Sequence, residues 1–235
     1  MCVAKVFLQG QTILIDKPKY WSSFQALKKV RFGIQRQFGI SKLKLGHAGT
    51  LDPLATGLLV LCSGKMTKNI DAIQKQKKQY TGTFVLGATT PSYDLETEFD
   101  ATFPTAHISE GHIRHLAGNM IGEISQQPPI YSAIKKKGKR LYEFARAKQD
   151  VEISLRKVQI YEFDITKIDM PQVHFRVLCS KGTYIRSLAN DFGKGLQSGA
   201  YLHELRRTKV GNYSVEDALK PDDFLNVLNQ NLNSI

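Results

Sequence analysis

The sequence predicts an α+β fold, because predicted strands and helices alternate irregularly along its 235 residues. The clearest strand runs from Val173 to Cys179, where every second side chain is apolar. No G-x-G-x-x-G or G-x-x-x-x-G-K-S/T phosphate-binding loop occurs, which argues against a doubly wound nucleotide-binding fold. A chain of this length buries a sizeable core without disulfides or metal, so we expect a single domain spanning residues 1–235.

The individual elements follow from hydrophobic spacing and from residues that begin or end helices. Short apolar runs predict strands at 12–15, 58–62 and 80–86. Apolar residues at three- to four-residue spacing predict helices after Ser22 or Ser23, around 66–73, near 109–117, at 185–196 and in the tail from Val215, with Pro221 as a first helical residue. Residues 46–57 contain too much glycine and proline for regular structure, and 87–104 form an acidic loop.

Composition excludes several classes of protein. No run of about 18 apolar residues is present, so no membrane span is expected. The N-terminus lacks the apolar core of a signal peptide, and the cysteines Cys2, Cys62 and Cys179 show no C-x-x-C pairing. We therefore expect a cytoplasmic protein without a zinc site.

The distribution of charge is more informative than its total. The formal net charge is +12, from 33 lysines and arginines against 21 aspartates and glutamates. Residues 17–51 contain eight cations and no acid, and 133–148 contain seven cations and one acid, whereas 79–113 contain five acids and no cation. An even surplus would indicate only a solvated basic surface, but this segregation favours a phosphate-binding face for nucleic acid.

Asp52 stands out because it is the first acid after Asp16 and lies among glycines, just before Pro53. A structural interpretation is that it caps a turn, since Asp-Pro turns are common. A functional interpretation is that it acts as a covalent nucleophile, because a carboxylate in a basic groove would otherwise repel phosphate. Composition alone leaves the two interpretations balanced.

Residues 46–57, GHAGTLDPLATG, resemble the catalytic motif of the tRNA pseudouridine synthase B family. Four further regions resemble that family in the same order: Asp16-Lys17-Pro18 with Ser22-Ser23, Tyr80 with Leu86-Gly87, residues 129–135 with 138–146, and residues 180–188 with 205–208. Any one tripeptide is a weak signal, but five ordered segments over roughly residues 12–215 are a strong one.

The resemblance implies a pseudouridine synthase fold with a mixed, mainly antiparallel sheet flanked by helices. It implies isomerisation of uridine to pseudouridine at position 55 of the tRNA T-loop, with the target base flipped out of the loop. No cofactor or metal is needed, and the expected partner is the T-arm of tRNA, bound by a monomer. Many family members continue into a C-terminal RNA-binding domain of the PUA type, which is not expected here because the chain stops at Ile235.

The resemblance also implies roles for single residues. Asp52 matches the nucleophile, Tyr80 matches a tyrosine that stacks on the base and assists proton removal from C5, and Arg186 matches the arginine that pairs with the aspartate. The matches to substrate-binding residues are His47, Tyr184, Leu205 and Lys17. A thumb-like segment at about 128–150 implies RNA contacts, and the cations expected to bind RNA are Lys135, Lys139, Arg140, Arg146 and Arg206.

Each role has a structural alternative. Tyr80 could pack at a sheet edge, Arg186 could form a surface ion pair, Leu205 could belong to the core, His47 could cap a turn, and 132–148 could be a solvated helix face. The whole chain could also be a non-catalytic tRNA-binding or RNA-folding protein on the same scaffold. A nucleoside or glycoside hydrolase is a weaker alternative, because it would need a second catalytic carboxylate.

Two departures from the family pattern are visible. Tyr20 stands where the N-terminal motif has glycine, so the turn there is expected to differ or to face RNA. Pro91 stands where the family has the first aspartate of an acidic motif, so only Asp94 carries over from that motif.

Overall fold

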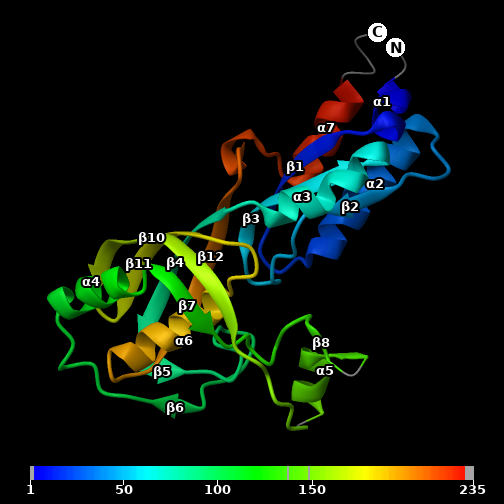
Figure 1. Ribbon diagram of the computed structural model, residues 1–235. Coiled ribbons are helices and arrows are strands. Elements are labelled where there is room, and N and C mark those ends of the chain that lie inside the picture. The colour runs from blue at the N-terminus through cyan, green and yellow to red at the C-terminus, as the bar shows by residue number, and fades with distance from the viewer. Residues whose placement is uncertain (1–2, 137, 148, 231–235) are drawn as a thin grey trace. The chain divides into compact units, whose positions relative to one another are not determined.

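The computed structural model describes residues 3–136, 138–147 and 149–230 (Figure 1). Cys2 and two cations of the basic segment, Lys137 and Lys148, lie outside the described residues. The chain divides into two compact units, one formed by Met1–Tyr80 with Arg206–Ile235 and the other by Thr81–Leu205. That the chain forms one catalytic domain stays a prediction.

The first unit is built on strand β3, which is buried along most of its length. Its strands are β1 (Thr12–Lys17), β2 (Leu45–His47), β3 (Thr56–Ser63), the start of β4 (Lys78–Leu86), the end of β12 (Ala200–Val210) and β13 (Tyr213–Ser214). β1 and β2 pair antiparallel with β3, and β12 pairs parallel with its first residues. The predicted strands at 12–15 and 58–62 are confirmed.

The helices of the first unit are α1 (Val3–Gln9), α2 (Ser23–Phe38), η1 (Gly64–Asn69), α3 (Ile70–Lys75), η2 (Val215–Asp217) and α7 (Pro221–Gln230). Of the two predicted caps, Ser22 and Ser23, the structure uses Ser22. Its hydroxyl accepts from the N–H of Gln25, while the Gln25 side chain accepts from the N–H of Ser22. The buried face of α2, including Val30 and Ile34, packs in one core with residues of β1 and β3.

The second unit carries the other antiparallel strands, in the order β12-β4-β11-β10-β7. Its elements are the end of β4, β5 (Ala88–Thr89), β6 (Ala101–Thr102), α4 (Glu110–Asn119), β7 (Gly122–Gln126), β8 (Lys135–Lys136), β9 (Lys139–Arg140), α5 (Leu141–Arg146), β10 (Arg156–Asp169), β11 (Gln172–Cys179), α6 (Ile185–Gly195) and the start of β12. Phe84, Phe163, Phe175 and Phe192 form its aromatic core, with the rings of Phe84 and Phe175 4.2 Å apart.

The predicted α+β class is therefore confirmed, as are the strands at 80–86 and 173–179 and the predicted helices. The expectation that 46–57 lacks regular structure is wrong at both ends, because Gly46 and His47 belong to β2 and β3 begins at Thr56. Gly57 shows why glycine content was a poor guide to structure here. It has φ +99°, and a Cβ there would lie 2.3 Å from the carbonyl oxygen of Arg207. Glycine is required here by close strand approach, not by a flexible loop.

Candidate active site

The loop that carries Asp52 is fixed on its N-terminal side by Ser23, the first residue of α2. The Ser23 hydroxyl accepts from the N–H of Leu51 at 2.8 Å and donates to the carbonyl of Leu51 at 3.0 Å. Both Ser23 and Leu51 are buried. Because one hydroxyl satisfies both backbone groups of Leu51, the residue before Asp52 is held in a single orientation.

The C-terminal side of Asp52 is fixed by the turn after β1. The carbonyl of Pro53 accepts from the N–H of Tyr20 at 2.7 Å and from Nζ of Lys17 at 3.4 Å. Nζ of Lys17 also donates to the carbonyls of Pro18 and Trp21, at 2.9 and 2.6 Å. Lys17 is completely buried, so its ammonium group is enclosed by these oxygen atoms. The N-terminal motif and the Asp52 loop are thus one structure.

The Tyr20 turn keeps the conformation expected of a glycine. Tyr20 has φ +68°, in the left-handed region, while its side chain is 72% exposed. A non-glycine residue in this region costs roughly 1 kcal/mol. This backbone conformation delivers the Tyr20 N–H to the carbonyl of Pro53. Whether the turn differs from that of the family stays a prediction.

Arg207 is a third restraint on the same loop, and the sequence assigned it no role. Its side chain is 1% exposed, with Nε donating to the carbonyl of Leu58 at 2.8 Å and Nη2 donating to the carbonyl of Gly49 at 3.1 Å. The guanidinium thereby links Gly49, before Asp52 in the chain, to Leu58, after it. The sequence does hold one clue to Arg207, which is that it follows Arg206 directly on a strand. Consecutive side chains of a strand point to opposite faces, so one of these two arginines must point inward.

The charges of Asp52 and Arg207 act on the pKa values of their neighbours. Burial lowers the pKa of Lys17 to about 8, although the Asp52 carboxylate opposes this shift, and Arg207 lowers the pKa further. Burial and then the charge of Arg207 also lower the pKa of His47, so the imidazole is neutral at pH 7. The structure therefore brings together four groups of the first unit: a half-buried carboxylate, a buried ammonium group, a neutral imidazole and a buried guanidinium.

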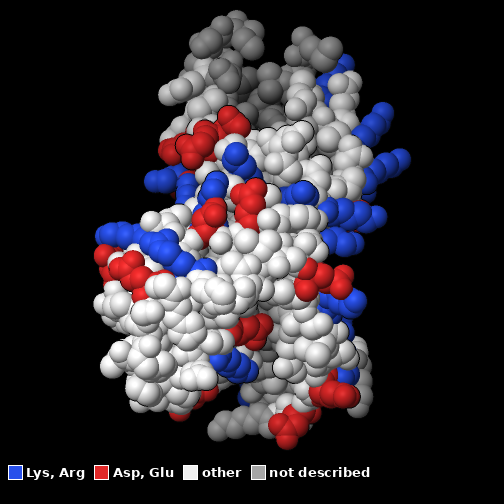
Figure 2. All heavy atoms as spheres, turned by 60° about the vertical axis from the view of Figure 1, so that its left-hand side comes forward, with Lys and Arg blue, Asp and Glu red and all other residues white. Residues whose placement is uncertain are grey.

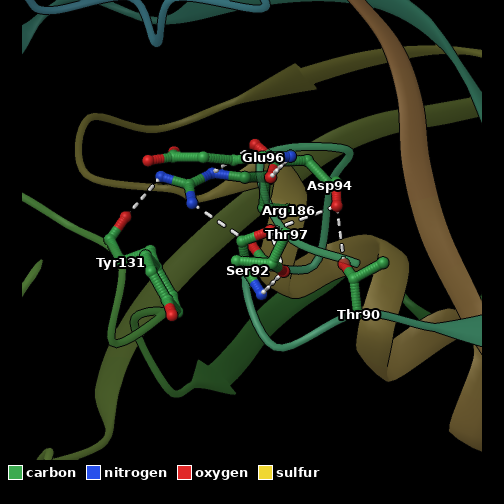
Figure 3. A network of polar contacts seen from close by, with 7 residues as sticks. All are labelled: Thr90, Ser92, Asp94, Glu96, Thr97, Tyr131 and Arg186. Atoms are coloured by element: carbon green, nitrogen blue, oxygen red, sulfur yellow. Dashed lines mark hydrogen bonds and ion pairs between the residues drawn. The ribbon is translucent and has the colours of Figure 1, made fainter. Parts of the chain in front are cut away.

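Arg186 is the centre of a buried network in the second unit (Figure 3). Its Nε atom lies 3.6 Å from Oδ2 of Asp94, while Nη1 and Nη2 donate to the carbonyls of Ser92 and Tyr131 at 3.2 and 2.9 Å. The side chains of Arg186 and Asp94 are 3% and 5% exposed. The alternative of a surface ion pair is therefore wrong for Arg186.

The turn that presents Asp94 is itself held by hydroxyl groups. The carbonyl of Asp94 accepts from Thr90 at 2.6 Å and from Ser92 at 3.1 Å, and Oδ1 of Asp94 accepts from the N–H of Glu96 at 3.0 Å. Figure 3 shows Thr90, Ser92 and Asp94 on one side of the Arg186 guanidinium and Tyr131 on the other, with the Glu96 side chain extending across the guanidinium. Asp94, the residue that carried over from the family motif, is thus a buried counter-ion of Arg186.

The remaining predicted substrate residues lie in both units. Tyr80 is buried in β4 at the end of the first unit. Tyr184 precedes α6 and Leu205 lies in β12, both half-buried in the second unit. His47 lies in β2, and its buried Nδ1 atom has no hydrogen-bond partner among the described residues. The predicted pairing of Asp52 with Arg186 links residues of different units and stays a prediction.

The thumb-like segment contains a short basic hairpin, β8–β9, followed by α5. Lys135, Lys139, Arg140 and Arg146 are exposed. Leu141 of α5 is 1% exposed, so the segment is not merely a solvated helix face. Lysine and arginine side chains project from the surface in clusters, with acidic side chains among them (Figure 2).

Arg206 differs from the thumb cations because it has a strong partner within the protein. Its Nη1 and Nη2 atoms lie 2.9 and 2.8 Å from the two carboxylate oxygens of Asp16. This two-pronged geometry favours a fixed ion pair. The predicted RNA contact of Arg206 stays a prediction.

Two searches of the described residues bear on other kinds of site. No helix in residues 3–136, 138–147 and 149–230 has the length and apolar character required to cross a membrane. Within the same ranges, no group of three or more His, Cys, Asp and Glu side chains is arranged to hold a metal ion.

Comparisons with known proteins agree with the motifs. Residues 35–185 match the model described as TruB family pseudouridylate synthase (N terminal domain), and residues 186–234 match the tRNA pseudouridylate synthase B C-terminal domain. The chain is 60% identical over 214 residues to tRNA pseudouridine synthase B of Flavobacterium johnsoniae, covering 91% of this chain and 93% of that protein. It is 47% identical over 224 residues to the Phocaeicola vulgatus protein of the same name, covering 95% of each chain.

A solved structure supports the same fold. A chain from the crystal structure of a Cbf5-Nop10-Gar1 complex superposes with a TM-score of 0.70 at 28% identity, covering 94% of this chain. The match spans 54% of that chain, about half its length. The pseudouridine synthase fold predicted from the sequence is confirmed. The protein therefore belongs to the TruB family of tRNA pseudouridine synthases, which are isomerases.

Proposed function

We propose that this protein converts the uridine at position 55 of the tRNA T-loop into pseudouridine, with Asp52 as the covalent nucleophile. The observation that carries the proposal is the restraint of the Asp52 loop on both sides. Ser23 fixes Leu51, Lys17 and Tyr20 fix Pro53, and Arg207 fixes Gly49. A surface turn needs no such set of buried donors, whereas a nucleophile must be held close to its reactive geometry.

The charges around Asp52 suit a carboxylate nucleophile. Lys17 and Arg207 are buried cations, and the field of the Asp52 carboxylate reaches Lys17 strongly enough to oppose the fall in its pKa. This coupling places Asp52 beside buried positive charge, a setting that suits a carboxylate nucleophile.

The reaction rearranges one nucleotide without a net change in its atoms. The N1–C1′ glycosidic bond breaks, the uracil turns, a C5–C1′ bond forms, and the C5 proton is lost to solvent while N1 gains one. No electrons or groups are transferred to another molecule, so the proposed chemistry needs no cofactor. Asp52 is proposed to form the transient covalent bond, and Tyr80 or water is proposed to take the C5 proton.

Binding is proposed to involve the T-arm of tRNA. The target base must leave its stack, at a cost of a few kcal/mol that aromatic stacking and backbone contacts offset. Tyr80, His47, Tyr184 and Leu205 are proposed to contact the flipped nucleotide. The exposed cations of the thumb-like segment are proposed to bind RNA phosphates. Monomeric state and cytoplasmic location stay predictions.

A non-catalytic tRNA-binding protein on the same scaffold is the alternative proposal. It would need the basic surface but not a restrained carboxylate. Purified protein should therefore be incubated with an unmodified tRNA transcript and with the same transcript carrying cytidine at position 55. Pseudouridine, detected by carbodiimide labelling and primer extension, is expected at position 55 of the first transcript only. Tight binding of both without modification would favour the non-catalytic alternative.

A further inference from the structure

Tyr184 is held by two residues that face each other across neighbouring strands. Gln126 at the end of β7 and Arg156 at the start of β10 are directly paired in the antiparallel register. Their side chains both reach Tyr184, one at its backbone and one at its ring. Nothing in the family motifs quoted above involves either residue.

Gln126 fixes the backbone of Tyr184. Its side chain is completely buried, with Oε1 accepting from the N–H of Tyr184 at 2.7 Å and Nε2 donating to the carbonyl of Tyr184 at 3.0 Å. An amide side chain matches both backbone groups of one extended residue, as a neighbouring strand would. Because Tyr184 is the N-cap of α6, this contact also sets where the helix that carries Arg186 begins.

Arg156 fixes the ring of Tyr184. The guanidinium carbon lies 4.5 Å from the ring centroid. The Nε and Nη2 atoms are buried and have no hydrogen-bond partner among the residues that the structure describes. Burial lowers the pKa of Arg156, as expected for a desolvated cation. The stack with the ring, and not an ion pair, therefore accounts for the position of this guanidinium.

We propose that Arg156 and Gln126 are positioning residues that orient Tyr184 toward the substrate uracil. The inference rests on the proposed function, because it assigns Tyr184 to the substrate. It gives a reason for a half-buried arginine whose buried Nε and Nη2 atoms have no acceptor among the described residues. Arg156 acts on the reaction through the tyrosine ring, and Gln126 acts through the backbone that supports it.

A double-mutant cycle tests the coupling. Arg156→Met is expected to lower the single-turnover rate of pseudouridine formation about tenfold, with little change in the Kd for tRNA. The same substitution made in the Tyr184→Leu background is expected to have almost no further effect. Full additivity of the two substitutions would overturn the proposal, because it would show that Arg156 does not act through the ring.

Two further variants protect the test against simple misfolding. Arg156→Lys keeps the charge but loses the planar stacking group, so it is expected not to restore the rate, and full activity would contradict the stack. Gln126→Met removes both backbone contacts and is expected to lower the rate without weakening tRNA binding. A weaker Kd at an unchanged rate would contradict this role.

The matched control is Arg176→Met on the adjacent strand β11. Arg176 forms an exposed ion pair with Asp164 at 2.6 Å, and its loss is expected to leave the rate unchanged. Urea unfolding of each variant separates loss of stability from loss of positioning. An inactive wild type would overturn the proposed function and the inference with it, whereas an active wild type with an additive cycle would overturn the inference alone.

Discussion

The carboxylate of Asp94 lies 3.6 Å from Nε of Arg186, and both side chains are buried although 92 positions separate them in the chain. Removing one member of a buried ion pair costs about 3–5 kcal/mol. Asp94→Asn is therefore expected to lower the free energy of unfolding by several kcal/mol and to slow pseudouridine formation, as measured by urea unfolding and single-turnover assays.

The control for Asp94 is Asp164→Asn, which breaks the exposed pair with Arg176. Exposed pairs contribute about 0–1 kcal/mol, so this variant should unfold close to the wild type and keep its activity. Equal, small effects of both substitutions would show that Asp94 does not hold Arg186 in place.

Lys17 gives the stability of the protein a defined dependence on pH. Its pKa is about 8 in the folded state and 10.5 in the unfolded chain. Between these values the unfolded state binds the proton and the folded state does not, so this residue makes the free energy of unfolding rise with pH. Below about pH 8 both states are protonated, and the contribution of Lys17 is constant.

The comparison that isolates this effect is wild type against Lys17→Met, a substitution that keeps most of the buried volume. The difference in unfolding free energy should be flat below about pH 8 and should move by about 3 kcal/mol in favour of the wild type by pH 10.5. A constant difference across this range, measured by urea unfolding, would show that the Lys17 pKa is not lowered.

Arg207 links Gly49 and Leu58, on either side of Asp52, and also lowers the pKa of His47. Arg207→Met removes the donors to Gly49 and Leu58 and is expected to destabilise the fold by about 2–4 kcal/mol. It should also raise the pKa of His47, although not to its ordinary value, because burial is the larger cause of the shift. An NMR titration of the imidazole measures this directly. A His47 pKa that stays the same or falls would contradict the arrangement.

The exposed cations of the thumb-like segment should act on RNA affinity rather than on chemistry. Replacing Lys139 and Arg140 by alanine is expected to weaken tRNA binding and to lower the slope of log affinity against log salt by about one per cation. The rate at saturating tRNA should remain close to wild type. Lys167→Ala, in an exposed pair with Asp169, is the control. An unchanged salt slope for the double variant would show that these cations do not contact phosphate.

Much of the fold could be predicted because the helices and strands carry recognisable signals in their local sequence. α2 has a capping serine, a helical stripe of buried residues and a glycine at its end, all visible in the sequence. In β11 every second residue is buried, and the residues between them are exposed or half-buried. β10 was missed for a physical reason: its pairing with β11 shifts register between Ile160 and Glu162 and again between Ile165 and Lys167, which breaks the alternation.

The site residues that belong to sequence motifs were predicted. Those that only the three-dimensional structure reveals were missed. Asp52 and Lys17 follow from local sequence, but that Lys17 is completely buried beneath carbonyl groups does not. Arg207 and Arg156 look like ordinary surface cations in the sequence, because nothing local reports that a guanidinium is buried against a carbonyl or a ring. Such residues are identified only once distant strands are placed side by side.

The central claim is that Asp52 is the nucleophile, and Asp52→Asn tests it most directly. The variant keeps the size of the side chain and should fold and bind tRNA like the wild type. With tRNA carrying C5-tritiated uridine, the wild type should release the tritium of the target base, and the variant should be slower by roughly 10⁴-fold or more. Tritium release by Asp52→Asn at a rate near that of the wild type would contradict the account.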